Sequence, residues 1–318
     1  MSAPFTTPLD DNGDTLVGPL RSPRQLLARQ EYDAHASIHD DATAQKLGFK
    51  GGTIEGPTHF SQFAPLCVAA WGTRWLEQGC LSAHYRNPCF EGERVRAYLA
   101  KTVAGATHST IWMQREDGTE ILRGTASIGP EHAVTALDQR LTQLRPPEQR
   151  VILKDVTVGM RSARVPVRMD AHQHMGALYP FSLADKLQVI TESSAWYTAT
   201  GANGSPWGRA IIPFEMISVL LNHASSSVQF PLRGPVVGLF ADQEIRLLRG
   251  PLFVGEAYEL EREVVALSGS RRTESMWVRT SVYRPGSQEV VATMLLNSAY
   301  LKDSYANYAS EAALSSAS

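Results

Sequence analysis

The sequence predicts an α+β protein made of two copies of one unit, in which an antiparallel sheet wraps around a central helix. The main observation is an internal repeat: RNPCFEGE at residues 86–93 and RGPLFVGE at residues 249–256 share five of eight residues. An apolar segment of helical length precedes each copy, and segments of alternating polarity flank and follow it. A sheet that wraps a helix covers the helix and buries one of its own faces, so each unit is a complete layer arrangement.

Length and composition agree with two such units. At about 150 residues per domain, a chain of this size predicts two domains. The sequence has 318 residues, of which 43% are hydrophobic and 19% charged, so it can form a buried core and is not disordered throughout. The formal net charge of −2 disfavours both a nucleic-acid-binding protein and a polybasic membrane-surface protein.

The predicted domain boundaries follow the polar and proline-rich segments. Residues 1–20 are predicted to be an extended N-terminal arm, and residues 303–318, rich in Ser and Ala, a flexible tail. Pro146 and Pro147 are flanked by charged residues and indicate a linker near the middle of the chain. The first domain is therefore expected at residues 21–145 and the second at residues 146–302.

Three long segments predict helices, and residues 130–150 contain a shorter helical pattern before Pro146. Residues 57–71 and 212–228 are apolar on most sides, which is typical of buried helices, and these are the expected central helices of the two units. Residues 182–200 carry apolar side chains at helical spacing and predict an amphipathic helix at the start of the second half.

Each half then predicts four strands, because alternating segments are separated by turns rich in Gly and Pro. In the first half they are residues 81–85, 95–103, 109–115 and 120–128. In the second half they are residues 239–248, 257–267, 273–283 and 289–301.

Cysteine usage and the N-terminus predict a cytoplasmic protein. Cys67, Cys80 and Cys89 are odd in number and lack CxxC spacing, which argues against a disulfide framework and a zinc knuckle. The N-terminal residues have no apolar stretch of the kind found in signal peptides. The apolar runs at 64–71 and 210–221 are far shorter than the ~18 to 20 residues that span a bilayer, so no membrane association is expected.

No metal or cofactor is predicted. His172 and His174 lie on the same face of an extended segment, but no third ligand follows in register. Gly51 and Gly52 are not followed by the Gly-Lys-Ser/Thr of a phosphate-binding loop.

The repeated octapeptide resembles the F-x-x-P-V-F-x-G-D/E phrase of MaoC-like proteins, the branch of the hotdog fold that includes the (R)-specific enoyl-CoA hydratases. Residues 39–49 (HDDATAQKLGF) resemble the His and Ala-rich part of the family's site motif, and residues 51–56 the approach to its central helix. The resemblance covers about residues 25–130 and 180–300, most of the chain. It implies a double hotdog fold and a lyase that hydrates enoyl thioesters or dehydrates 3-hydroxyacyl thioesters in fatty acid metabolism.

The resemblance also implies catalytic residues. His39 matches the family's histidine, and Asp33 is the candidate for its aspartate, at six residues before the histidine where the family has five. His35 is an alternative base, and Glu55 an alternative acid because some hotdog thioesterases place a carboxylate near this helix. A purely structural interpretation makes His39 a polar residue at the start of the next helix, beside capping Asp residues.

Hydration of an enoyl thioester needs a base for the water, an acid for the α-carbon and donors for the enolate oxygen. The first N–H groups of a helix are unpaired and carry partial positive charge, so residues 56–58 are candidates for an oxyanion hole. Gly56 also lacks a Cβ, which allows a thioester to approach closely. The candidate oxyanion and substrate-binding residues are Gly56, Pro57, Thr58, Ser61, His59 and His35. A packed His59 and a core Ser61 are the structural alternatives.

The second half resembles the same motif without its acid and base. Ala202 takes the position of the aspartate and Trp207 that of the histidine, so catalysis is expected in the first half. The expected partners are an acyl-CoA or acyl-carrier-protein substrate and, from the fold, a second copy in a homodimer. Two alternatives remain open: a thioesterase using Glu55 or Asp33, and a non-catalytic acyl-binding subunit.

Overall fold

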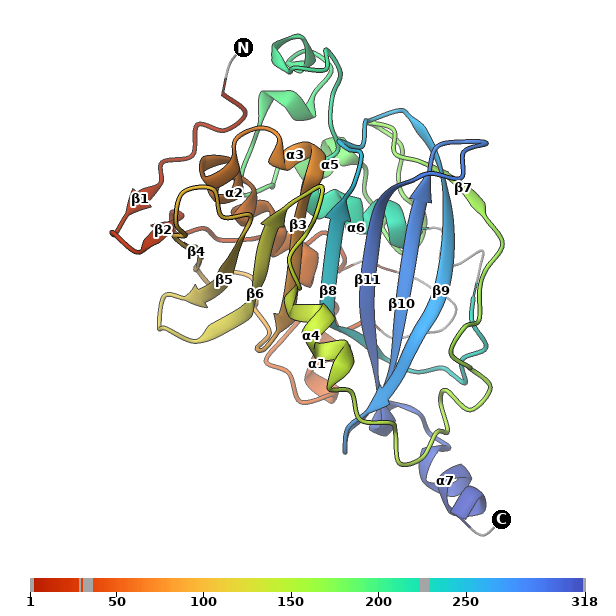
Figure 1. Ribbon diagram of the computed structural model, residues 1–318. Coiled ribbons are helices and arrows are strands. Elements are labelled where there is room, and N and C mark those ends of the chain that lie inside the picture. The colour runs from red at the N-terminus through yellow and green to blue at the C-terminus, as the bar shows by residue number, and fades with distance from the viewer. Residues whose placement is uncertain (1–2, 29, 31–36, 224–228, 317–318) are drawn as a thin grey trace.

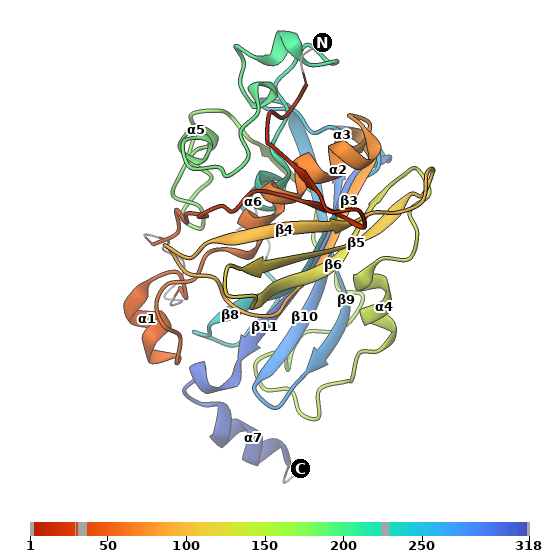
Figure 2. The same ribbon diagram turned by 90° about the vertical axis from the view of Figure 1, so that its left-hand side faces the viewer.

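The computed structural model describes residues 3–28, 30, 37–223 and 229–316. Within these residues, the strands form one antiparallel sheet in the order β1-β2-β4-β5-β6-β3-β8-β11-β10-β9-β7 (Figure 1). The central helices lie on one face of this sheet and α4 (Ala136–Thr142) on the other, as Figure 2 shows.

Each predicted strand is present, with ends that differ by a few residues at most. The first half contains β3 (Gly79–Tyr85), β4 (Val95–Ala100), β5 (His108–Arg115) and β6 (Glu120–Ile128). The second half contains β8 (Gly238–Leu247), β9 (Ala257–Gly269), β10 (Thr273–Tyr283) and β11 (Val290–Leu301). Buried and half-buried residues alternate along β4, because one sheet face packs on the helices, whereas the first five residues of β3 are all buried.

The two halves meet at the antiparallel pair β3–β8, which forms the seam of the molecule. At the 163-residue offset of the repeat, Leu81 corresponds to Glu244 and Ser82 to Ile245. In the register, Leu81 pairs with Ile245 and Ser82 pairs with Glu244. Replacing each residue of one pair by its equivalent in the other half gives the other pair, as a twofold axis requires. An approximate twofold axis therefore passes through the seam.

The N-terminal segment differs from the predicted extended arm, because part of it belongs to the sheet. The strands β1 (Asp10–Asp11) and β2 (Thr15–Val17) extend the first half beyond β4, and β7 (Val165–Arg168) extends the second half beyond β9. Arg21 then binds the buried carboxylate of Glu192 in the second half, with N–O distances of 2.7 and 3.1 Å. Strands of two or three residues are too short to show an alternating pattern.

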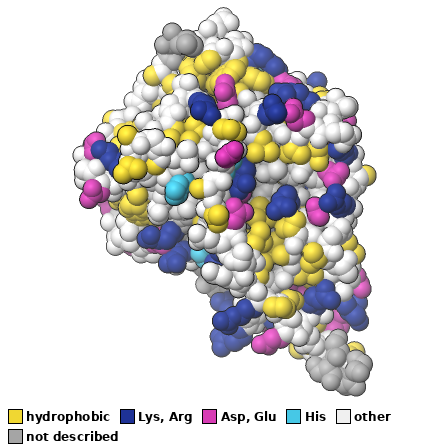
Figure 3. Space-filling model, in the orientation of Figure 1, with side chains coloured by type: hydrophobic (Ala, Val, Ile, Leu, Met, Phe, Trp, Pro, Cys, Tyr) yellow, Lys and Arg dark blue, Asp and Glu magenta, His cyan; other side chains and the backbone are white. Residues whose placement is uncertain are grey.

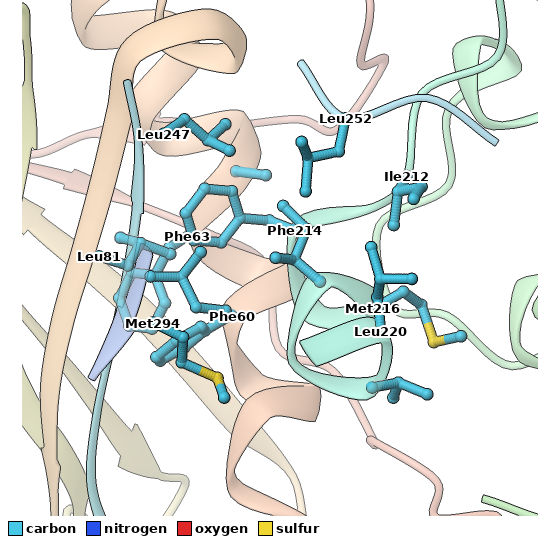
Figure 4. Packing of buried hydrophobic residues seen from close by; sticks show 14 of the residues in the cluster. Phe60, Phe63, Leu81, Ile212, Phe214, Met216, Leu220, Leu247, Leu252 and Met294 are labelled. Atoms are coloured by element: carbon cyan, nitrogen blue, oxygen red, sulfur yellow. The ribbon is translucent and has the colours of Figure 1, made fainter. Parts of the chain in front are cut away.

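The two central helices are confirmed and pack against each other. The first begins as a 3-10 turn, η1 (Gly56–Gln62), and continues as α2 (Phe63–Trp71); the second is α6 (Phe214–His223). Residues 224–228 of the predicted second helix lie outside the described part of the chain. Phe214 stacks on Trp75 with ring centroids 4.9 Å apart and lies 6.3 Å from Phe60. Figure 4 shows side chains of both helices in this single apolar cluster.

The predicted helix at 182–200 is wrong in its length. Only α5 (Leu183–Leu187) is α-helical there, followed by the 3-10 turns η2 (Ala195–Tyr197) and η3 (Ala202–Gly204). A capping box between Ser182 and Asp185 begins α5, and the Ser194 hydroxyl caps the new turn by accepting from the Trp196 N–H. The apolar side chains thus pack from separate short elements.

The C-terminal segment also differs from the predicted flexible tail. After η5 (Lys302–Ser304), α7 (Tyr308–Ser316) forms a helix, and Tyr308 packs on an apolar cluster of the second half. Glu311 pairs with Arg233 and accepts from the Tyr305 hydroxyl at 2.8 Å. These contacts come from distant parts of the sequence, which composition does not indicate.

The remaining helices are α1 (Asp41–Lys46) and α3 (Trp75–Gln78), and the three cysteines are free and buried. The face in Figure 3 places acidic and basic side chains next to one another. Among the described residues, no helix combines the length and apolarity needed to cross a membrane. The same residues contain no cluster of three or more His, Cys, Asp or Glu able to hold a metal ion.

Candidate active site

A cavity of about 420 Å³ is bounded by the loop that precedes η1, by the end of β3 and by the first residues of β8. Its first-half wall includes His39, Glu55, Gly56, His59 and Tyr85. The second half contributes Tyr179 and the first residues of β8, among them Leu239 and Phe240. The structure thus brings together four residues singled out from the sequence, and both halves line the cavity that they share.

His39 has a defined tautomer. Its Nδ1 lies 2.7 Å from the carbonyl oxygen of Thr53, which can only accept, so Nδ1 carries the proton and Nε2 is left as an acceptor. Burial lowers the pKa of this imidazole, so it is neutral at physiological pH. The carboxylate of Asp40, not His39, caps α1 by accepting from the N–H groups of Ala42 and Thr43. The predicted capping role of Asp40 is thus confirmed, and His39 lies directly before the cap with its ring bound to the Thr53 carbonyl.

Glu55 is a buried carboxyl group in the same cavity. It precedes η1 without capping it, and 6% of its surface is exposed. Burial raises the pKa of Glu55 to about 7, against the opposing effect of the Lys186 ammonium group and with a further contribution from Glu215. A carboxyl group with such a pKa can both donate and accept a proton near neutral pH.

His59 is also buried but differs in its ionisation. Burial and the nearby Lys186 cation lower the pKa of His59 to about 3, so its ring stays neutral. Its Nδ1 is buried without a hydrogen-bond partner among the described residues. His59 can therefore contact a substrate but is a poor proton donor.

The helix start offers one backbone donor where the sequence suggested several. Pro57 has no N–H, and the Thr58 N–H donates to the carbonyl of Glu55 at 3.1 Å. Within the described chain, the Gly56 N–H has no partner. Pro57 and Thr58 do not line the cavity, and the Ser61 hydroxyl instead accepts from the N–H of Glu192 at 3.3 Å. Asp33 and His35 lie outside the described residues.

Tyr85, which sequence reasoning missed, covers Gly56. Its hydroxyl donates to Gln243 Oε1 of β8 at 2.9 Å, and Gln243 Nε2 donates to Ser218 of α6 at 2.7 Å. A Cβ on Gly56 would lie 2.5 Å from the Tyr85 ring. The only sequence feature that marks Tyr85 is its place directly before the repeated octapeptide.

The corresponding place in the second half is filled by aromatic side chains. The Ile54 N–H donates to the Cys89 carbonyl and the Ile212 N–H to the Leu252 carbonyl, so Phe214 stands where Gly56 stands in the first half. Nearby, Trp207 makes edge contacts with Trp196 and Phe253, with ring centroids at 5.7 and 6.4 Å. This arrangement agrees with the predicted loss of the site in the second half.

Replacing Gly56 by alanine is expected to lower the free energy of unfolding by about 2 kcal/mol, because overpacking a buried site forces its neighbours to move. The new methyl group would displace the Tyr85 ring and strain its bond to Gln243. Urea denaturation measures the effect, and Gly18→Ala is the matched control, since its nearest neighbour lies at 3.4 Å. In a Tyr85→Ala background the cost should shrink; an equal cost there would contradict the contact.

Comparisons with known proteins place the fold. The sequence matches no protein-family model and no curated protein. It is similar in structure to a protein named as a MaoC domain dehydratase from Chloroflexus aurantiacus, with a TM-score of 0.58, 14% identity and coverage of 91% of this chain and 95% of that one. A conserved hypothetical protein from Mycobacterium tuberculosis, described as a double hotdog fold, matches with a TM-score of 0.52, 11% identity and coverage of 94% and 99%.

These similarities and the twofold arrangement of helix and sheet define the class: the chain is a double hotdog protein. The predicted α+β double hotdog fold is confirmed.

Proposed function

We propose that this protein is a MaoC-like lyase that adds water to an enoyl thioester, or removes it from a 3-hydroxyacyl thioester, with His39 and Glu55 as its proton-transfer groups. The observation that supports it most is their shared cavity: a neutral imidazole with a defined acceptor nitrogen and a buried carboxyl group line it together. The unpaired Gly56 N–H at the same cavity adds a donor for the thioester oxygen.

In the hydration direction, His39 Nε2 takes a proton from water while the water oxygen bonds to the β-carbon. The electron pair of the double bond moves toward the carbonyl, and the Gly56 N–H donates to the developing enolate oxygen. Protonated Glu55 then gives its proton to the α-carbon. One proton passes from His39 back to Glu55 to restore both groups, and dehydration follows the same steps in reverse.

The acyl group is proposed to lie against the second half. The apolar Leu239 and Phe240 of β8 and the ring of Tyr179 form the wall of the cavity that comes from this half. Acyl-CoA is the proposed substrate, because an activated thioester is the group that a hydratase of this kind polarises. Asp33 remains a second proposed carboxylate.

The direct test is the absorbance of a panel of enoyl-CoA thioesters with short, long and aromatic acyl groups, recorded together with thiol release. Hydration removes the conjugated absorbance without free thiol. Free thiol instead would indicate the thioesterase alternative, for which the buried Glu55 carboxylate beside Gly56 is the favouring observation. No reaction, with thermal stabilisation by the same thioesters, would indicate an acyl-binding subunit and contradict the proposal.

The hydration rate is expected to fall as the pH rises through about 7, because ionised Glu55 has no proton to donate and burial raises its pKa to about 7. Dehydration should fall over the same range, because the overall reaction takes up no net proton and kcat/KM in the two directions therefore varies with pH in parallel. Glu55→Gln should lower both rates by about 10²-fold or more and remove this limb of the kcat/KM profile. A Glu55→Gln variant that keeps the limb would show that another group titrates there.

A further inference from the structure

A buried lysine of the second half lies behind the site of the first half. Lys186 belongs to α5 and is 3% exposed, and its ammonium nitrogen lies 3.0 Å from the Thr58 hydroxyl of η1. The same nitrogen lies 3.3 Å from Oε1 of Glu215 on α6. The Lys186 cation therefore contacts both central helices, through Thr58 of the first and Glu215 of the second. Thr58 lies in the first turn of η1, which Glu55 directly precedes.

Burying these charges is costly, which argues that they are held there for a purpose other than packing alone. Removing an ammonium or carboxylate group from water costs several kcal/mol per ion unless partners compensate it. Glu215 is 1% exposed, and neither of its carboxyl oxygens has a standard hydrogen bond among the described residues. Lys186 is thus the compensating charge for two buried carboxyl groups, Glu55 and Glu215.

We propose that Lys186 is a positioning residue of the active site, whose buried cation and the opposing Glu215 together set the ionisation of Glu55. The inference rests on the proposed function for its catalytic meaning. The proposal also gives the second half a role beyond lining the cavity. Lys186 of α5 and Glu215 of α6 supply the charges that control the ionisation of Glu55 in the first half.

Other groups face Glu55 from each neighbouring element. The ring of His59 from η1 and that of His39 from the preceding loop are neutral, because burial lowers the pKa of both. Tyr85 of β3 is neutral as well, since burial raises its pKa well above the usual range, as does the charge of Glu55. Among the described residues, Lys186 and Glu215 are therefore the charged groups that act on Glu55. Burial raises the pKa of Glu215 to about 7 as well, so its charge develops over the same pH range as that of Glu55.

The test titrates Glu55 directly, without a substrate. Carbon NMR of protein labelled at the glutamate carboxyl carbon follows each side chain with pH, and Glu55→Gln identifies the Glu55 resonance. Lys186→Met should raise the titration midpoint of Glu55 by about one pH unit or more, since it removes an opposite charge. Glu215→Gln should lower the midpoint, since it removes a like charge. Lys186→Arg retains the cation and should restore a midpoint close to that of the wild type.

Opposite shifts from two neighbouring substitutions are not expected of a merely structural role, which would move Glu55 in one direction or not at all. Lys50→Met, on a lysine with 73% of its side chain exposed, is the matched control and should leave the midpoint unchanged. If Lys186→Met fails to fold, Lys186→Met/Glu215→Gln removes both charges and should still raise the midpoint, because the cation acts more strongly on Glu55 than Glu215 does.

Unchanged midpoints in the folded variants, or shifts of the same sign, would overturn the inference. Failure of the proposed function is separate, because it appears as absence of enoyl-CoA turnover in the wild type while the titration is unaffected. If turnover is found, the falling limb of the hydration profile should move with the Glu55 midpoint in each variant.

Discussion

Replacing His39 by alanine is expected to lower kcat/KM for enoyl-CoA hydration by about 10³-fold or more, equivalent to roughly 4 kcal/mol of transition-state stabilisation. The loss is large because His39 Nε2 is the proposed acceptor of the water proton, and the Thr53 carbonyl fixes its tautomer. Steady-state absorbance kinetics measures the effect on the best substrate of the panel.

His39→Asn separates chemistry from structure at this position. An asparagine amide can still donate to the Thr53 carbonyl, but it has no counterpart of the Nε2 lone pair. We expect the fold to be retained and activity to be as low as in His39→Ala. If His39→Asn kept most of the wild-type kcat/KM, His39 would be a structural residue and another base would have to be sought, with Asp33 first.

Replacing Asp242 by alanine is expected to lower the free energy of unfolding by about 3 kcal/mol, because it leaves several polar groups at the seam without their acceptor. Asp242 is 0% exposed. Its carboxylate lies 2.8 Å from Nδ1 of His84 on β3 and 2.7 Å from Nε of Arg140 on α4, and it accepts from Asn297 of β11 at 2.8 Å. One side chain thus ties strands of both halves to the helix on the outer sheet face.

Urea denaturation of Asp242→Ala, read by circular dichroism, gives this free energy. The matched control is Asp303→Ala, because Asp303 is exposed in η5 and its loss should cost less than about 0.5 kcal/mol. Equal stabilities of the two variants would show that the carboxylate cluster contributes little to joining the halves.

The strands and central helices could be predicted because their patterns are local. The segment at 120–128 alternates in polarity, and β6 has these same bounds in the structure. The repeat then indicated two equivalent units, and equivalent units that share a sheet meet at a twofold seam, as β3 and β8 do. The same reasoning failed at 182–200, where apolar spacing suited a helix but Ser194 begins a new turn after α5.

Part of the site could also be predicted, because a motif lies within one stretch of chain. His39, Glu55 and Gly56 were found from 18 consecutive residues, and all three line the cavity. Tyr85 and Lys186 were not, since nothing near them in the sequence indicates that a strand end and a short helix of the other half approach η1.

The amino-acid order was sufficient for the repeating unit, its helix and strands, and the residue types available for proton transfer. Those properties depend on side-chain periodicity and on neighbours along the chain. Packing of distant segments was needed to assign the tautomer of His39, to leave the Gly56 N–H unpaired and to place Lys186 and Glu215 behind Glu55. Hydrogen bonds and buried charges act through space, so the bond between His39 and Thr53 appears only when the first half folds. The charges of Lys186 and Glu215 reach η1 only when the two halves pack together.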